Sequence, residues 1–234
     1  MLPLVSLVTP TYNRRRFIPS LIRCIEQQTY PKDRLEWIVL DDGQDLVGDL
    51  FKQCSLNVTY IYSDEKLTIG EKRNKLNELA KGDIIVAIDD DDFYFPERVM
   101  SAVTSLNSNP TIDLAGSSEV YMYFTKSKEI YKAGPYFQGH ATNGTMAWRK
   151  RYALSRSYDE TVVFAEEKSF LEDYKNQLVQ LNPMECMLVV CHSDNTFDKT
   201  NLLKNSNSPF ITKTTLSLND FIKDETLRIF YESF

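Results

Sequence analysis

The chain has 234 residues and carries 33 acidic against 27 basic residues, a formal net charge of −6 at pH 7. Hydrophobic residues make up 42% and aromatic residues 12%, which suffices for a globular core and excludes a mainly disordered chain; the acidic balance does not favour a nucleic-acid partner. No apolar stretch approaches the roughly 18 residues needed to span a bilayer, and the start has no signal-peptide pattern, so we expect no transmembrane segment and a cytoplasmic location.

The first half of the chain alternates strand-like and helix-like segments. Apolar runs predict strands at residues 4–9, 35–40, 57–62 and 84–89. Amphipathic segments predict helices at residues 17–28 and 70–80, and Pro96 occupies the favoured first-turn position of another helix. This alternation predicts βαβ units and a mainly parallel sheet. Right-handed crossovers would then place the loops after Thr9, Leu40 and Ile88 along one edge of the sheet.

Beyond about residue 110 the predicted elements become shorter and less regular. We predict a hairpin at 120–124 and 129–131, a loop at 134–144, a helix at 165–177, a strand at 185–190 and mild helicity at 218–231. With no internal repeat or low-complexity linker, the simplest organisation is one domain over residues 1–200 with a helical C-terminal appendage at 201–234.

Four consecutive aspartates, residues 89–92, close the apolar run at 84–88. Clustered carboxylates repel one another and lose hydration, so such a cluster normally requires a cation. Oxygen ligands suit Mg²⁺ or Mn²⁺, which also bind substrate phosphates, and open α/β sheets bind ligands beyond the carboxyl ends of their strands. The pattern predicts a metal–diphosphate site; a solvated acidic turn is the alternative.

Two further loops and one helix start have polar content suited to a nucleotide. Tyr12, after the first strand, can stack on a flat ring, and the carboxylates of residues 41–42 can accept hydrogen bonds from an imide N–H or a ribose hydroxyl. Both loops are equally compatible with ordinary turns. Lys72, Arg73 and Lys75 open a predicted helix and suit an anion site, although a solvated basic face would look the same.

Four segments together resemble the nucleotide-sugar-binding half of family 2 glycosyltransferases, which have the GT-A fold. They occur in order and at compatible spacing, at residues 3–13, 37–43, 70–74 and 82–92. The resemblance is strong to about residue 100 and weaker to about 200. It implies an α/β GT-A fold with a mainly parallel central sheet flanked by helices, a nucleotide-sugar-binding half at 1–100 and an acceptor half at 101–200.

The resemblance also implies roles for individual residues of the first half. The stretch Asp89-Asp90-Asp91 matches the DxD element, so Asp91 would coordinate Mn²⁺ or Mg²⁺ and Asp89 would contact the metal or the ribose, with Asp90 between them.

Further residues of the first half match donor-binding positions of the family. Asp42, with Asp41 beside it, matches the aspartate that contacts the nucleobase. Pro10 and Tyr12 would line the base pocket, and Arg73 would approach the base or the diphosphate.

The second half is expected to supply the catalytic base. Inverting transfer needs a carboxylate that takes the proton of the acceptor hydroxyl. Glu167 aligns with the usual base and Glu166 is the reserve, in a sequence that departs from the commoner Glu-Asp pair; Asp173 is a weaker candidate. Acidic residues in a first turn also stabilise helices on their own.

The two histidines receive different interpretations. In several GT-A enzymes a late histidine contacts the metal or diphosphate, so the resemblance implies His192 as a metal ligand, with a structural role as the alternative. His140 lies in a loop that resembles the donor-sugar and acceptor region, and we assign it binding at most.

The expected activity is metal-dependent, inverting transfer of a sugar from a nucleotide-diphosphate donor, preferably a UDP-sugar, to a hydroxyl of a glycan or glycoconjugate. A Gln-x-x-Arg-Trp element is missing, which favours single transfers over processive synthesis. Two alternatives stay open. A sugar nucleotidyltransferase would show a glycine-rich triphosphate loop, and residues 9–16 contain no glycine. A catalytically idle sugar-nucleotide or glycan-binding module would keep donor binding without turnover.

Overall fold

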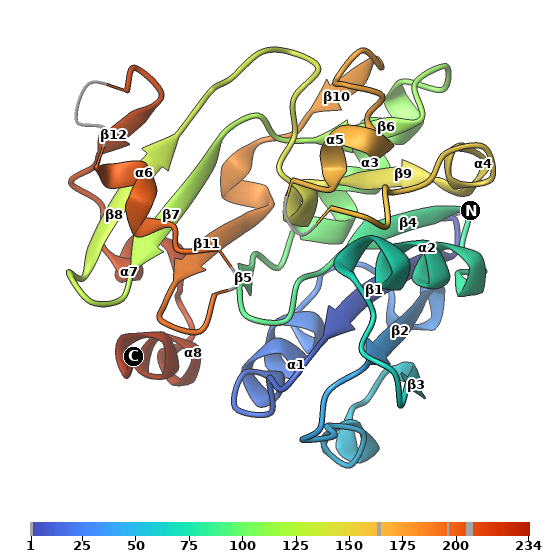
Figure 1. Cartoon of the computed structure of the whole chain (residues 1–234), viewed down its shortest axis with the longest axis horizontal. Coiled ribbons are helices and arrows are strands. Elements are labelled where there is room, and N and C mark those ends of the chain that lie inside the picture. The colour runs from blue at the N-terminus through green and yellow to red at the C-terminus, as the bar shows by residue number, and fades with distance from the viewer. Residues whose placement is uncertain (1, 163–164, 196, 205–207) are drawn as a thin grey trace.

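The computed structural model describes residues 2–162, 165–195, 197–204 and 208–234, which form two β-sheets with helices around them (Figure 1). The strands of the larger sheet are β1 (Val5–Thr11), β2 (Leu35–Asp41), β3 (Asn57–Tyr62), β4 (Ile84–Ala87), β6 (Leu114–Gly116), β9 (Ala147–Arg149) and β10 (Leu178–Gln180). Those of the smaller sheet are β5 (Phe93–Tyr94), β7 (Val120–Phe124), β8 (Glu129–Ala133), β11 (Met187–Cys191) and β12 (Ile211–Lys213).

The helices lie between these strands and at the C-terminal end. The α-helices are α1 (Ile18–Glu26), α2 (Ile69–Leu79), α3 (Arg98–Ser108), α4 (Lys150–Ala153), α5 (Glu167–Phe170), α6 (Thr200–Leu203), α7 (Leu218–Phe221) and α8 (Glu225–Glu232). Short 3₁₀ turns are η1 (Lys32–Arg34), η2 (Leu50–Gln53), η3 (Asn143–Thr145) and η4 (Pro183–Glu185).

The larger sheet confirms the predicted parallel arrangement of the first four strands. Its order is β10-β6-β9-β4-β1-β2-β3, and β3, β2, β1 and β4 are parallel neighbours. β9 runs antiparallel to both β4 and β6, and this insertion was not predicted. The carboxyl ends of β1, β2 and β4 therefore meet at one edge, as the crossover rule requires.

Alternate residues of the buried strands divide the apolar core into two layers. Leu7 and Val86 pack on the face covered by α1 and α3, and this layer continues into the smaller sheet. Val8 and Ile85 pack on the opposite face with side chains of α2 and α4. Since successive strand residues point to opposite faces, uninterrupted apolar runs are what a sheet covered on both sides needs.

The C-terminal segment contributes to the same core. β12 pairs with β8, and Phe221, Leu227 and Tyr231 are buried among residues of the first layer. The Tyr231 hydroxyl donates a hydrogen bond to the Asp92 carbonyl oxygen at 2.9 Å. Helix α8 lies beside α1 at the C-terminal end of the chain (Figure 1). Residues 201–234, predicted as a helical appendage, thus provide a strand and core side chains; the domain boundary at residue 200 stays a prediction.

One predicted helix is wrong. Residues 165–177 were expected to be helical, whereas α5 covers only Glu167–Phe170. The residues Glu172, Asp173 and Tyr174 have φ values of 50°, 56° and 62°, in the left-handed region that ends a right-handed helix. The predicted strand at 185–190 is shifted, because η4 occupies its first position and β11 begins at Met187. In the described part of the chain, no helix has both the length and the apolar character to cross a membrane.

Candidate active site

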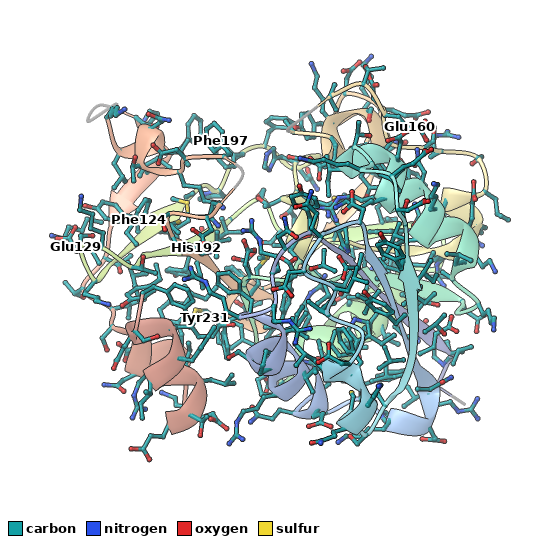
Figure 2. All side chains as sticks on the ribbon, turned by 60° about the horizontal axis from the view of Figure 1, so that its bottom comes forward. Phe124, Glu129, Glu160, His192, Phe197 and Tyr231 are labelled. Atoms are coloured by element: carbon teal, nitrogen blue, oxygen red, sulfur yellow. The ribbon has the colours of Figure 1, made fainter. Side chains whose placement is uncertain are left out.

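A cleft of about 880 Å³ lies beyond the carboxyl ends of β1 and β4. Most of the residues predicted for the site line it: Pro10, Tyr12, Arg73, Asp89, Asp90, Asp91 and Glu166. The loop after β11 closes one side with Asn195 and Phe197. Figure 2 shows Phe197 and His192 on the side of the smaller sheet and Glu160 at the opposite end of the molecule.

Asp91 is held by a group of polar side chains at the centre of the acidic block. Its Oδ2 lies 3.2 Å from the His192 Nε2 and accepts a hydrogen bond from the Asn195 amide at 3.2 Å. The His192 Nδ1 accepts from the Asp194 backbone N–H, which assigns the ring proton to Nε2 and makes it the donor to Asp91. Arg14 lies 3.6 Å from Asp91. Burial acts to raise the pKa of Asp91, but the His192 hydrogen bond and nearby cations outweigh it and lower that pKa.

Asp90 and Asp92 have different surroundings. Asp90 lies 3.6 Å from the Arg14 guanidinium, and burial together with the charge of Asp91 raises its pKa. Asp92 accepts a hydrogen bond from the Val190 backbone N–H at 2.7 Å, and burial holds its pKa well above the ordinary value. Asp92 therefore fastens the acidic block to β11.

Arg73 joins the acidic block to the segment that carries the predicted base. Its Nη2 lies 3.0 Å from Asp89 Oδ1, and its Nε lies 2.8 Å from Glu166 Oε1. In the amide orientation that satisfies its neighbours, the Asn143 oxygen accepts from the same guanidinium at 2.8 Å. Burial alone would lower the pKa of Arg73, but the two carboxylates outweigh it and raise that pKa. Arg73 is therefore a fixed cation at the floor of the cleft.

Asp41 and Asp42 hold the loop after β2 and do not line the cleft. Asp41 accepts hydrogen bonds from the backbone N–H groups of Gly43 and Val47 and from the Tyr60 hydroxyl. Asp42, whose side chain is fully buried, accepts from Lys72 Nζ at 2.7 Å and from the Leu67 N–H at 2.8 Å. Lys72, which lines the cleft, is thus paired with Asp42, and this carboxylate offsets the attraction of its ammonium group for an anion.

Pro10 and Tyr12 lie where the resemblance implied a base pocket. The Lys66 ammonium lies 4.4 Å from the centroid of the Tyr12 ring. The adjacent Asn13, with φ of 54°, accepts from the backbone N–H groups of Gln44 and Asp45. This contact ties the loop after β1 to the loop after β2 and fixes the position of Tyr12.

The two adjacent glutamates have different partners. Glu166 is buried against Arg73, whereas the described residues provide no ion pair for Glu167. Burial, and next the charge of Glu166, raise the pKa of Glu167 to about 7. A carboxylate with this pKa suits proton abstraction at neutral pH. Asp173, the weaker candidate, is exposed near Lys168 and Lys175.

The side chains at the acidic block can be compared with the ligands that a metal ion needs. Among the described residues, no three His, Cys, Asp or Glu side chains converge as a closed metal centre would require. Mg²⁺ or Mn²⁺ beside a diphosphate needs only one or two carboxylates, because water and phosphate supply the rest. Asp91 fits this requirement, and His192 fits it once a metal replaces the Nε2 proton that now lies between the two side chains, whereas the Asp89 carboxylate is committed to Arg73.

Several residues of the site were missed in the sequence. Arg14 and Asn195 contact the acidic block, and Asn143 contacts Arg73. Fully buried Arg98 donates to the Met146 carbonyl at 2.7 Å and to that of Ala87 at 3.4 Å, bracing the end of β4. Only the basic character of residues 14–16 was a visible signal; the other partners depend on tertiary contacts.

Residues 6–171 match the family described as Glycosyl transferase family 2. The chain belongs to this family. The match spans both the acidic block and the Glu166-Glu167 pair, whereas the cleft residues of β11 and the loop after it lie beyond the match.

Curated relatives of this family 2 chain carry glycosyltransferase names. An uncharacterized glycosyltransferase of Methanocaldococcus jannaschii is 27% identical over 205 residues, which cover 76% of this chain and 68% of the relative. An uncharacterized glycosyltransferase of Haemophilus influenzae is 30% identical over 110 residues, which cover 47% of this chain and 37% of the relative.

Solved structures confirm the predicted GT-A fold of this family 2 member. The mannosyltransferase PcManGT from Pyrobaculum calidifontis, in complex with GDP-Man and Mn²⁺, superposes with a TM-score of 0.66 at 17% identity, covering 83% of this chain and 59% of that one. Staphylococcus aureus TarS 1–349 in complex with UDP-GlcNAc gives 0.65 at 18% identity, covering 82% and 59%. The chain thus spans less than two thirds of both solved chains.

Proposed function

We propose that this chain is a metal-dependent, inverting and non-processive glycosyltransferase that uses a nucleotide-diphosphate sugar, preferably a UDP-sugar, and a hydroxyl of a glycan or glycoconjugate. One observation carries the proposal. Arg73 bonds both Asp89 of the acidic block and Glu166, the neighbour of the base candidate, at 3.0 and 2.8 Å. Arg73 thereby fastens the acidic block to the segment that carries the base candidate, and Asp89 and Glu166 line the same cleft.

The donor would occupy the part of the cleft between Tyr12 and the acidic block. The Tyr12 ring offers a stacking surface for the base. Asp91 and His192 would hold Mn²⁺ or Mg²⁺, which when bound neutralises the charge that develops on the leaving diphosphate. Arg14 and Lys199 also line the cleft and add positive charge beside the phosphates. That PcManGT was solved with GDP-Man and Mn²⁺ is consistent with this arrangement.

Glu167 would act as the general base. Its carboxylate accepts the proton of the acceptor hydroxyl while that oxygen attacks the anomeric carbon from the face opposite the diphosphate. The bond between the anomeric carbon and the diphosphate oxygen breaks, and the nucleotide diphosphate departs with the electron pair. Glu166 would orient the site through Arg73, because its oxygen already accepts a hydrogen bond from that guanidinium.

Calorimetric titration with UDP, GDP and dTDP, with and without Mn²⁺, tests the donor site. We expect metal-dependent binding of one nucleotide by the wild-type protein and its loss in Asp91→Asn. Arg151→Gln, which changes an exposed ion pair with Asp113, is the matched control and should bind normally. No binding of any nucleotide under either condition would reject the transferase.

Turnover separates the transferase from the two alternatives. An idle binding module would bind the nucleotide but release none from the sugar donor in a screen of acceptors, in wild type and Glu167→Gln alike. A sugar nucleotidyltransferase would release pyrophosphate from a nucleoside triphosphate and a sugar phosphate. The transferase predicts acceptor-dependent release of the nucleoside diphosphate.

A further inference from the structure

Five aromatic side chains from three separate segments gather beside the family 2 cleft. This aromatic platform consists of Tyr136, Phe137, His140, Tyr174 and Phe210. The His140 and Tyr174 rings stack with centroids 5.1 Å apart, and Phe137 meets Tyr174 edge-on at 5.4 Å. Tyr136 contacts His140 at 4.6 Å and Phe210 at 5.0 Å. The loop between β8 and η3 that carries three of these rings crosses from the smaller to the larger sheet (Figure 1).

The platform presents uncharged apolar rings to solvent. Phe137 is 55% exposed and Phe210 is 43% exposed, although both are large hydrophobic side chains. Burial lowers the pKa of His140, so its ring is neutral at neutral pH. Exposed rings of this kind, grouped rather than scattered, indicate a surface that meets a ligand.

The backbone under the platform is strained in a way that positions Tyr174. Three successive residues without special conformational freedom, ending at Tyr174, adopt positive φ values. Each such residue is disfavoured and persists only where its surroundings enforce it, which is common at functional sites. The Tyr174 carbonyl oxygen also approaches Gly139 so closely that a Cβ there would lie 2.2 Å from it. Both segments are therefore shaped to bring Tyr174 against the His140 loop.

The platform is continuous with the catalytic part of the cleft. Tyr174 follows directly on the segment that begins at Glu167, where the Asp173 N–H donates to the Lys168 carbonyl oxygen at 2.9 Å. Thr142, two residues after His140, lines the cleft itself, as does Glu166. The platform thus adjoins the segment that carries Glu167 and the loop that brings Thr142 to the cleft.

We propose that the aromatic platform binds a pyranose ring of the acceptor and sets its hydroxyl before Glu167. Pyranose rings have faces of C–H groups that pack on aromatic rings, and a neutral platform suits an uncharged glycan better than a phosphorylated or acidic one. The inference rests on the proposed function for its reaction, but the binding event itself does not require turnover.

Saturation-transfer NMR with maltotriose, cellotriose and chitotriose, in the presence of UDP and Mn²⁺, tests the platform. At least one trisaccharide should bind the wild-type protein. In Phe137→Ala and in Phe210→Ala its Kd should rise about 3- to 10-fold, the loss expected for one ring contact. Both side chains are exposed, so folding should be unaffected. Ile229→Ala, which removes a 58% exposed side chain on α8, is the matched control and should bind as wild type.

The outcomes separate this inference from the proposed function. Unchanged trisaccharide affinity in both phenylalanine variants, or no binding of any trisaccharide by the wild-type protein, would overturn the platform even where UDP binds. Trisaccharide binding that weakens in Phe137→Ala while UDP fails to bind would support the platform and reject the transferase. UDP affinity should be the same in wild type, Phe137→Ala and Ile229→Ala.

Discussion

The carboxylates in the loops after β1–β4 and those in the segment around α5 differ in their cationic partners. In the loops, Asp42 is paired with Lys72 at 2.7 Å and Asp89 with Arg73 at 3.0 Å. In the segment around α5, Glu166 shares Arg73, but Glu167 has no ion pair among the described residues, and burial raises its pKa to about 7. A carboxylate that is paired with a cation stabilises the fold, whereas an unpaired carboxylate with a pKa near neutral pH is available for proton transfer.

The largest expected effect comes from removing the unpaired carboxylate. Glu167→Gln keeps the shape of the side chain but cannot accept the proton, so kcat should fall about 10²- to 10⁴-fold. Affinity for the nucleotide, measured by calorimetry with Mn²⁺, should stay unchanged because the donor site lies elsewhere in the cleft. Glu78→Gln, an exposed change on α2, is the control for charge. A larger loss in Glu166→Gln than in Glu167→Gln would reverse the two roles.

Breaking the ion pairs that Arg73 makes should lower the stability of the protein. Arg73→Met leaves Asp89 and Glu166 without their shared cation, so the free energy of unfolding should fall by about 3–5 kcal/mol. Urea denaturation followed by circular dichroism measures it. Arg151→Met removes an exposed partner of Asp113 and should change the free energy of unfolding far less, because water screens exposed ion pairs. Equal losses in the two variants would show that Arg73 does not carry the network.

The part of the site formed by the loops after β1–β4 could be predicted from the sequence, because the patterns that indicate it lie within short segments of the chain. Runs such as residues 84–88 are apolar throughout, as buried parallel strands must be, and the four aspartates mark where β4 delivers its ligands. The positions of β1–β4 followed from these signals, and the family resemblance added Tyr12 and Arg73 to the residues expected beside Asp91; all three line the cleft.

The second half resisted prediction because its conformation depends on distant contacts. Residues 165–177 have helical composition, yet positive φ values from Glu172 to Tyr174 end the helix, and Tyr174 packs on His140 more than 30 positions away. The three-residue strands β6, β9 and β10 are too short to show a period. Partners such as Arg14 and Asn195 follow from tertiary packing and have no spacing signature.

The unpaired carboxylate should also produce opposite pH trends in activity and stability. With a folded pKa of about 7 against roughly 4.3 unfolded, Glu167 binds its proton more tightly in the folded state. Its contribution to stability is therefore full below about pH 4.3 and is lost as the pH rises through 7, while kcat/KM rises over the upper part of that range as the base ionises.

The Glu167→Gln variant lacks the ionisable carboxyl group, so comparing it with wild type measures how much Glu167 contributes to the pH dependence of stability. The variant should gain on the order of 2 kcal/mol in unfolding free energy relative to wild type between pH 5 and pH 8. Urea denaturation at the two pH values measures the gain, and Glu78→Gln should show no such change. An identical pH dependence in wild type and Glu167→Gln would mean that Glu167 is ordinarily acidic and not poised as a base.

The smallest expected effect comes from Asp224. It tests whether ion pairs also join the C-terminal segment to the first half of the chain. Asp224 caps α8 by accepting from the Leu227 N–H at 3.0 Å and bonds Arg23 and Gln27 of the α1 region at 2.8 and 2.7 Å. The Arg23 hydrogen bond, foremost, lowers the pKa of Asp224 to about 2, so this contribution is present above about pH 4 and is lost as the pH falls toward 2.

Asp224→Ala should therefore lower the unfolding free energy by about 1 kcal/mol at pH 7, the usual value of a helix cap. The difference should disappear near pH 2. Because Tyr231 and Leu227 share the core of the first half, the variant should still unfold in a single transition seen alike by circular dichroism and tryptophan fluorescence. Two separate transitions would show that residues 201–234 behave as the appendage first predicted, and that the charge network ends at β11.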